Sequence, residues 1–189
     1  MGRISLWTSL EQSFRVRSPP KKNPPMFIAH LPAGYLGACL LTRRAAAERR
    51  HLLFVPFVVG SIFPDADMLY FYLIDQGRHL HHDYWTHLPV FWLAAWGVSL
   101  ILALILRSRA LALAATSFVG GVFLHLLLDT PFAGIRWLYP LSDQSFFLVT
   151  VPATRSWWVW SFVVHWTFLF EIVICIAALL LLLMRRRRA

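Results

Sequence analysis

The chain has 189 residues, a length typical of one domain, and 58% of them are hydrophobic while 14% are charged. This composition, with apolar runs of about twenty residues, excludes an ordinary soluble domain and predicts an integral membrane protein. The formal net charge of +9 would suit a nucleic-acid partner. Because the arginines cluster beside apolar segments, as topology-setting charges do, we expect no nucleic-acid binding and a lipid bilayer as the main partner.

Residues 1–25 differ from the rest of the chain because they are basic and rich in proline, as in Ser18-Pro-Pro-Lys-Lys-Asn-Pro-Pro25. This composition predicts a disordered tail. The chain becomes apolar directly after Met26, so one hypothesis is that Met26 is the natural start and that residues 1–25 are a gene-model extension. We expect a helical membrane domain over 26–184 and a basic cytoplasmic tail over 185–189.

Five apolar segments follow the tail and predict an all-α membrane protein with about four to five transmembrane helices. They are residues 27–41, 52–63, 88–106, 110–128 and 157–184. The second segment would rise only about 18 Å at 1.5 Å per residue, against a hydrocarbon core of about 30 Å. Asp65 and Asp67, which follow it, should therefore lie below the membrane surface, in backbone that Pro64 makes irregular.

The basic segments set the expected orientation. Residues 42–51, 107–109 and 185–188 carry most of the arginines of the membrane domain, and short basic loops usually stay in the cytoplasm. With this orientation the ionisable groups of the other loops converge on the outer half of the membrane. We therefore expect a polar His/Asp cluster there, facing the extracytoplasmic side.

Residues 79–87 hold four of the chain's eight histidines, beside Asp83 and just before an apolar segment. Neutral imidazole is the commonest protein ligand for transition metals, so this segment is a candidate metal site. The alternative interpretation is a hydrated interfacial loop, where His, Tyr and Trp lie at the level of the lipid headgroups. The segment by itself is compatible with both interpretations.

The other polar groups favour a metal. His125 and Asp129 are four residues apart, so on a helix they share one face. Asp65 and Asp67 would repel each other, and a bound cation resolves such repulsion. The alternative for each carboxylate is a helix cap or an interfacial charge. The candidate metal ligands are His30, Asp65, Asp67, His87, His125 and Asp129.

The acidic residue Glu171 lies midway through the last apolar segment. An unpaired charge at that depth is unfavourable. We expect Glu171 to be either protonated or paired with a neighbouring helix.

The four polar clusters, in this order, resemble the YdjM-like family of inner-membrane-associated, LexA-binding proteins, which are classed as membrane-bound metal-dependent hydrolases. The matching motifs are Ala29-His30-Leu31, Phe63-Pro64-Asp65-Ala66-Asp67, His82-Asp83-Tyr84-Trp85-Thr86-His87 and His125-Leu-Leu-Leu-Asp129-Thr130-Pro131. The chain departs from the family where Asp83-Tyr84 replaces Arg-Gly and Leu88 replaces Ser. The resemblance implies a metal-dependent hydrolase in the bacterial inner membrane.

The first functional hypothesis is a hydrolase that attacks an ester or phosphoester with a water activated by a divalent metal, zinc being expected from His and Asp ligands. His82 or Asp83 would then be a further ligand or the general base. The depth of the site suits a lipid or lipid-linked substrate. The alternatives are a metal carrier or sensor, and a structural or partner-binding protein whose clusters stabilise the fold; the sequence identifies no protein partner.

Overall fold

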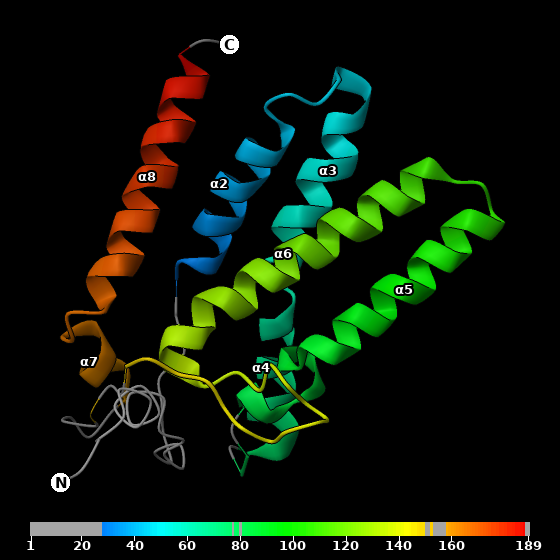
Figure 1. The fold of residues 1–189 in the computed structure, drawn as a ribbon. Coiled ribbons are helices and arrows are strands. Elements are labelled where there is room, and N and C mark those ends of the chain that lie inside the picture. Colours follow the sequence, from blue (N-terminus) through cyan, green and yellow to red (C-terminus); the bar gives the residue numbers. More distant parts are fainter. Residues whose placement is uncertain (1–27, 77, 80, 150–151, 153–157, 188–189) are drawn as a thin grey trace, which may run out of the picture.

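The computed structural model describes residues 28–76, 78–79, 81–149, 152 and 158–187 (Figure 1). Over this part the regular structure is helical, and one isolated antiparallel bridge joins Ile135 to Phe146. The all-α class predicted from the sequence is confirmed for these residues. The expected tail at residues 1–25 lies outside the described part of the chain, so the predictions made for it stay predictions.

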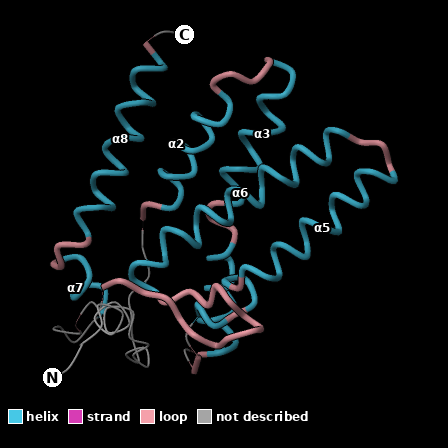
Figure 2. The backbone as a smooth tube through the Cα atoms, in the orientation of Figure 1, coloured by secondary structure: helices cyan, strands magenta, loops and turns pink. Residues whose placement is uncertain are grey.

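Five longer helices form the body of the molecule, with short helical turns between them (Figure 2). The longer helices are α2 (His30–Thr42), α3 (Ala47–Gly60), α5 (Pro89–Ile105), α6 (Arg109–Ala133) and α8 (Phe168–Arg186). The short elements are η1 (Pro64–Ala66), α4 (Asp67–Tyr70), the π-helical turn η2 (Phe71–Asp75), η3 (His81–Asp83), η4 (Trp85–His87) and α7 (Trp158–Val163).

Helix α6 is the centre of the arrangement, because it packs against α2, α3 and α5. Helices α2 and α3 form a hairpin, α5 and α6 form a second one, and α8 packs against α2 (Figure 1). The connections α2–α3 and α5–α6 and the end of α8 lie at one end of the molecule. The short turns from η1 to η4 lie at the opposite end.

Two glycines allow α3 and α6 to approach closely. A Cβ added to Gly60 would collide with the carbonyl group of Phe118, and one added to Gly121 would collide with the carbonyl of Phe57. The Ser117 hydroxyl also donates a hydrogen bond to the carbonyl of Leu53. Small residues and hydroxyl groups at helix contacts are typical of membrane proteins, because close backbone approach replaces the hydrophobic driving force.

The number of candidate membrane spans differs from the sequence expectation of four to five. Among the described residues, α6 and α8 are long and apolar enough to cross a membrane, and the bent pair 47–60 and 64–75 could count as a third. The reason is length. Helix α2 has 13 residues and α5 has 17, whereas a span needs about 20.

The last apolar segment, 157–184, is divided between two helices. Helix α7 ends at Val163, α8 begins at Phe168, and His165 Nδ1 lies 2.9 Å from Thr167 Oγ1 in the break. The break places Glu171 in the first turn of α8. There its fully buried carboxylate accepts a hydrogen bond of 2.6 Å from the amide of Ile28, just before α2. Both expected alternatives are compatible with this contact, because a protonated carboxyl group also accepts a hydrogen bond through its carbonyl oxygen.

Candidate metal centre

The short turns and the ends of two helices bring seven ionisable side chains of the sequence analysis to one end of the molecule. His30 begins α2, while His125 and Asp129 lie one turn apart near the end of α6. The remaining residues come from the short turns, namely Asp65 from η1, Asp67 from α4, His82 from η3 and His87 from η4. Segments far apart in the sequence thus meet at one place.

Asp129 lies at the centre of this cluster and is fully buried. Its Oδ1 is 3.1 Å from His30 Nε2, and its Oδ2 is 3.1 Å from His125 Nε2. The same Oδ2 lies 3.6 Å from His82 Nε2 and 3.8 Å from His87 Nε2. Four imidazoles therefore surround one carboxylate in an environment without solvent, where an unneutralised charge would be very unfavourable.

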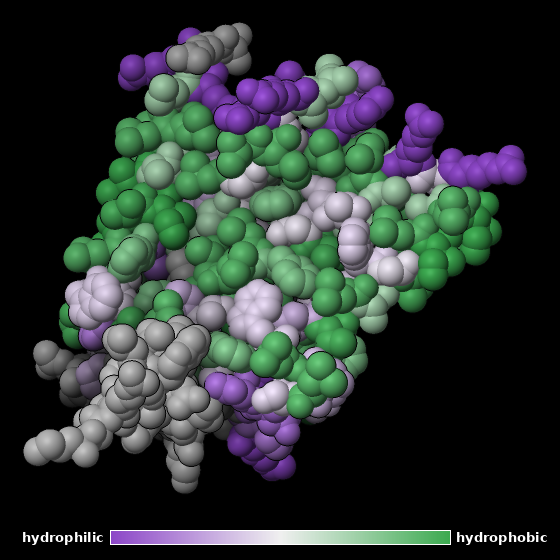
Figure 3. Space-filling view, viewed as in Figure 1, coloured by the Kyte–Doolittle hydropathy of each residue, from purple (hydrophilic) through white to green (hydrophobic). Residues whose placement is uncertain are grey.

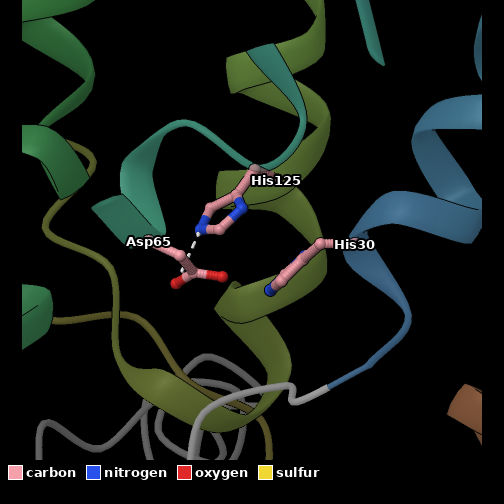
Figure 4. Close-up of side chains that lie close together, drawn as sticks. All are labelled: His30, Asp65 and His125. Carbon is pink, nitrogen blue, oxygen red and sulfur yellow. Dashed lines mark ion pairs between the residues drawn. The ribbon is translucent and has the colours of Figure 1, made fainter. Parts of the chain in front are cut away.

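The ligand atoms fall into two adjacent groups, each with its atoms within 4.8 Å of one another. One group is His30, Asp65 and His125, and Figure 4 shows these side chains converging from α2, η1 and α6. The other is His82, His87 and Asp129. The groups adjoin, because His125 Nε2 lies 3.4 Å from His87 Nε2. The cluster could thus hold one or two metal ions.

Two of the histidines are held in orientation by oxygen atoms that contact their Nδ1 atoms, on the side of the ring away from the cluster. His125 Nδ1 lies 2.9 Å from the carbonyl oxygen of Ser61, the residue directly after α3. His87 Nδ1 lies 2.9 Å from Asp67 Oδ2, which also accepts a hydrogen bond from the hydroxyl of Thr86. Because a carbonyl or carboxylate oxygen accepts, both Nδ1 atoms carry the proton. Such outer partners fix the tautomer and orientation of metal-binding histidines.

The tautomer of His87 leaves its facing nitrogen as an acceptor. With the proton on Nδ1, the Nε2 atom of neutral His87 presents a lone pair toward the carboxylates of Asp65 and Asp129. Burial lowers the pKa of His87, against the opposing effect of Asp67, and so favours its neutral form. Converging acceptors in a buried site require a cation or additional protons between them.

The spacing of these atoms fits a metal ion. Zinc binds imidazole nitrogen and carboxylate oxygen at about 2.0–2.2 Å, so two ligand atoms of one tetrahedral ion lie about 3.3–3.6 Å apart. Six imidazole–carboxylate pairs and one pair of imidazoles in the cluster lie 3.1 to 3.9 Å apart, and all ligand atoms of each group lie within 4.8 Å of one another. The residues present therefore fit a divalent ion.

Asp83 is the candidate that the structure places away from the cluster. Its side chain is half exposed and lies 3.5 Å from Arg136, whose guanidinium also donates a hydrogen bond of 2.8 Å to the Asp83 carbonyl. His82, by contrast, is buried among the ligand atoms. The two residues proposed for ligand or base roles thus occupy different surroundings.

The sequence reasoning missed three groups near the cluster. Ser61, whose carbonyl holds His125, carries no signal in the sequence, whereas Thr86, which contacts Asp67 and His87, stands in the motif from His82 to His87 that carries the family resemblance. The third is Asp75 with His79, a buried carboxylate that lies 2.7 Å from the imidazole Nδ1 and 2.8 Å from the backbone amide of His79. The spacing of four residues could have indicated this pair.

A cavity of about 720 Å³ adjoins the cluster. Its wall includes Asp67 and Thr86, the two residues that hold His87, and the Asp75 and His79 pair. Tyr70 and Trp85 contribute apolar surface to the same wall. A small molecule in this cavity would lie one layer of side chains from the candidate ligands.

The fold and the site define a class, a helical membrane protein with a buried His/Asp cluster able to hold metal. The chain belongs to the YdjM inner membrane protein family, whose model matches residues 26–189. This result confirms the resemblance noted in the sequence and locates the protein in the inner membrane. Searches of curated proteins and of solved structures gave no match.

Proposed function

We propose that this protein is a membrane-embedded metal-dependent hydrolase that cleaves an ester or phosphoester. The observation that carries the proposal is the convergence of four imidazole nitrogens on the buried Asp129, at the spacing of ligands around a divalent ion. Zinc is the ion that a set of His and Asp ligands favours. A divalent ion bound there would lower the pKa of a coordinated water and so supply a nucleophile near neutral pH.

The residues of the chain divide into ligands and groups that orient them. His30, His82, His87, His125 and Asp129 are buried, so we assign them to holding the ion. Asp65 leaves a third of its side chain exposed, and water would approach on its side. Asp65 is therefore placed to accept a proton from an attacking water, while Asp67 and Thr86 hold His87.

A lipid or lipid-linked substrate is the class that the surroundings support. The cavity beside the cluster lies next to the segment α4–η2, which exposes Leu69, Leu73 and Ile74. Exposed apolar side chains of a membrane protein contact acyl chains. A substrate whose apolar part stays in the bilayer could bring its polar ester into this cavity without leaving the membrane.

We also infer that the bacterial membrane surrounds more of the chain than the two or three qualifying spans. Helix α5 exposes apolar side chains along its whole length, among them Phe91, Val98 and Ile105. This pattern supports a position inside the bilayer although α5 is short. It is compatible with four to five membrane-embedded helices, with the cluster on the extracytoplasmic side.

The test combines metal content with turnover. Full-length protein purified in detergent should contain one or two equivalents of zinc or another transition metal by elemental analysis. The His125→Ala/Asp129→Ala variant should lose both the metal and the hydrolysis of a panel of lipid and phosphoester substrates. Asp143→Asn, which alters an exposed carboxylate, should retain both.

Two results would contradict the proposal in different ways. If the protein contains metal but hydrolyses no ester, it would be a metal carrier or sensor, because the ligands would then only bind the ion. A folded wild type that contains no metal and takes none up would make the cluster a structural hydrogen-bond network.

A further inference from the structure

A second cavity lies at the opposite end of the molecule from the metal centre. It has a volume of about 390 Å³, is open to one side, and is lined by residues from the end of α2, the beginning of α3 and the end of α8. Its polar wall is formed by Arg43, Arg50, His51 and Arg185, and its apolar wall includes Phe54 and Val55. Arg43 and Arg50, from the two sides of the α2–α3 connection, and Arg185, from the distant end of α8, thus contribute to one small space.

The arginines of this cavity have no carboxylate partner among the described residues. In the part of the chain that the structure describes, no ion pair joins Arg43, Arg50 or Arg185 to a carboxylate. Arg50 Nε is held by a hydrogen bond of 3.1 Å to the Ala45 carbonyl, so one guanidinium is already positioned. Guanidinium groups bind phosphate oxygens with two parallel hydrogen bonds.

The surroundings of the cavity select the kind of anion. The α8 residues just before Arg185 are exposed and apolar, among them Leu180, Leu183 and Met184. Figure 3 shows the hydrophilic end of the molecule directly beside a broad hydrophobic surface. A ligand bound here would have its polar headgroup next to the arginines and its apolar part next to the exposed side chains of α8. Basic pockets between membrane helices are known as binding sites for anionic lipid headgroups.

We propose that this cavity binds the phosphate of an anionic phospholipid whose acyl chains lie against α8. The phosphodiester occupies the space between Arg43, Arg50 and Arg185, and the chains run along the exposed leucines. The site is independent of the hydrolase proposal, since the metal centre lies at the other end of the helices. It would fasten α8 to the α2–α3 hairpin at the membrane surface.

The test is native mass spectrometry of the full chain in detergent, titrated with phosphatidylglycerol or with phosphatidylcholine of the same acyl chains. The wild type should bind phosphatidylglycerol more tightly. The Arg50→Gln/Arg185→Gln variant should bind it at least about tenfold more weakly, because each arginine near an anionic lipid contributes about 1 kcal/mol. The control Arg44→Gln/Arg49→Gln removes the same charge from the α2–α3 region but alters no residue of the cavity wall.

Three outcomes would overturn the proposal. Equal losses in both double variants would show a general surface-charge effect, and an unchanged preference in the cavity variant would show that the cavity is not involved. Displacement of the lipid by millimolar inorganic phosphate would assign the cavity to a free anion. Thermal stabilisation of the wild type by phosphatidylglycerol over phosphatidylcholine provides a measurement that does not depend on how well the variants fold.

Discussion

Asp65 and Asp67 are one residue apart in the sequence, yet their carboxylates contact different groups. Asp65 Oδ1 lies 3.7 and 3.9 Å from the Nε2 atoms of His125 and His87, on the side where an ion would sit. Asp67 Oδ2 instead contacts Nδ1 of His87, on the far side of the imidazole. Positions two apart on a helical turn point in different directions, so the backbone from η1 into α4 separates the two carboxylates.

This difference predicts a graded effect of substitution at Asp67. Asp67→Asn keeps the shape but removes the charge that orients His87, and substitution of such outer partners typically lowers metal affinity about 10- to 100-fold. Titration of the metal-free variant should therefore show weaker binding at unchanged stoichiometry, whereas Asp129→Asn should show loss of stoichiometric binding. Loss of stoichiometric binding in Asp67→Asn as well would instead make Asp67 a direct ligand, as the sequence analysis had it.

The sequence indicated the members of the cluster but not their arrangement. His125 and Asp129 could be paired because helical spacing fixes their common face. Which carboxylate faces an ion and which supports a histidine depends on the turns between Pro64 and His87, and no periodic pattern describes these turns. Asp83 illustrates the limit, since its position beside the histidines did not indicate the contact with Arg136.

At the scale of elements, the position of His125 depends on the packing of α3 against α6. Gly60 and Gly121 allow the two backbones to approach, and this approach brings the Ser61 carbonyl to the His125 ring. The break after α3 then directs the chain into η1, where Asp65 meets the cluster. Helix packing and site geometry are therefore coupled through one short segment.

Gly121→Ala tests this coupling. The new methyl group would collide with the Phe57 carbonyl and the Ser61 amide nitrogen, and overpacking of this kind typically costs about 1–3 kcal/mol. We expect a lower melting temperature in detergent and weaker metal binding. Gly97→Ala is the matched control, because a Cβ at Gly97 meets nothing within 4 Å; the variant should be unchanged or slightly more stable, as alanine favours helix by about 1 kcal/mol. If both substitutions changed the melting temperature and the metal affinity equally, metal binding would not depend on the packing of α3 against α6.

The helices themselves were largely predictable, because apolar runs locate helices inside a membrane. Their ends were not. The break between α7 and α8 falls inside a continuous apolar run, and it is accompanied by tertiary contacts such as that between Glu171 and Ile28. The short lengths of α2 and α5 likewise follow from where the chain turns, which hydropathy does not report.

At the scale of the whole molecule, most of the exposed arginines and the His/Asp cluster lie at opposite ends of the helices. Exposed arginines occupy the α2–α3 connection, the α5–α6 connection and the end of α8, which meet at one end (Figures 1 and 3). The cluster lies among the short turns at the other end. This polarity supports the orientation in which the arginines face the cytoplasm and the site faces outward.

Cysteine labelling in intact cells would test this orientation. The two native cysteines, Cys39 and Cys175, are first replaced by alanine, and single cysteines are then introduced at Asp143, on the site side, or at Arg107, on the basic side. A membrane-impermeant maleimide should label Asp143→Cys in intact spheroplasts and Arg107→Cys only after the membrane is opened. The reverse pattern would place the metal centre on the cytoplasmic side, so that a substrate would reach it from the inner leaflet or the cytoplasm.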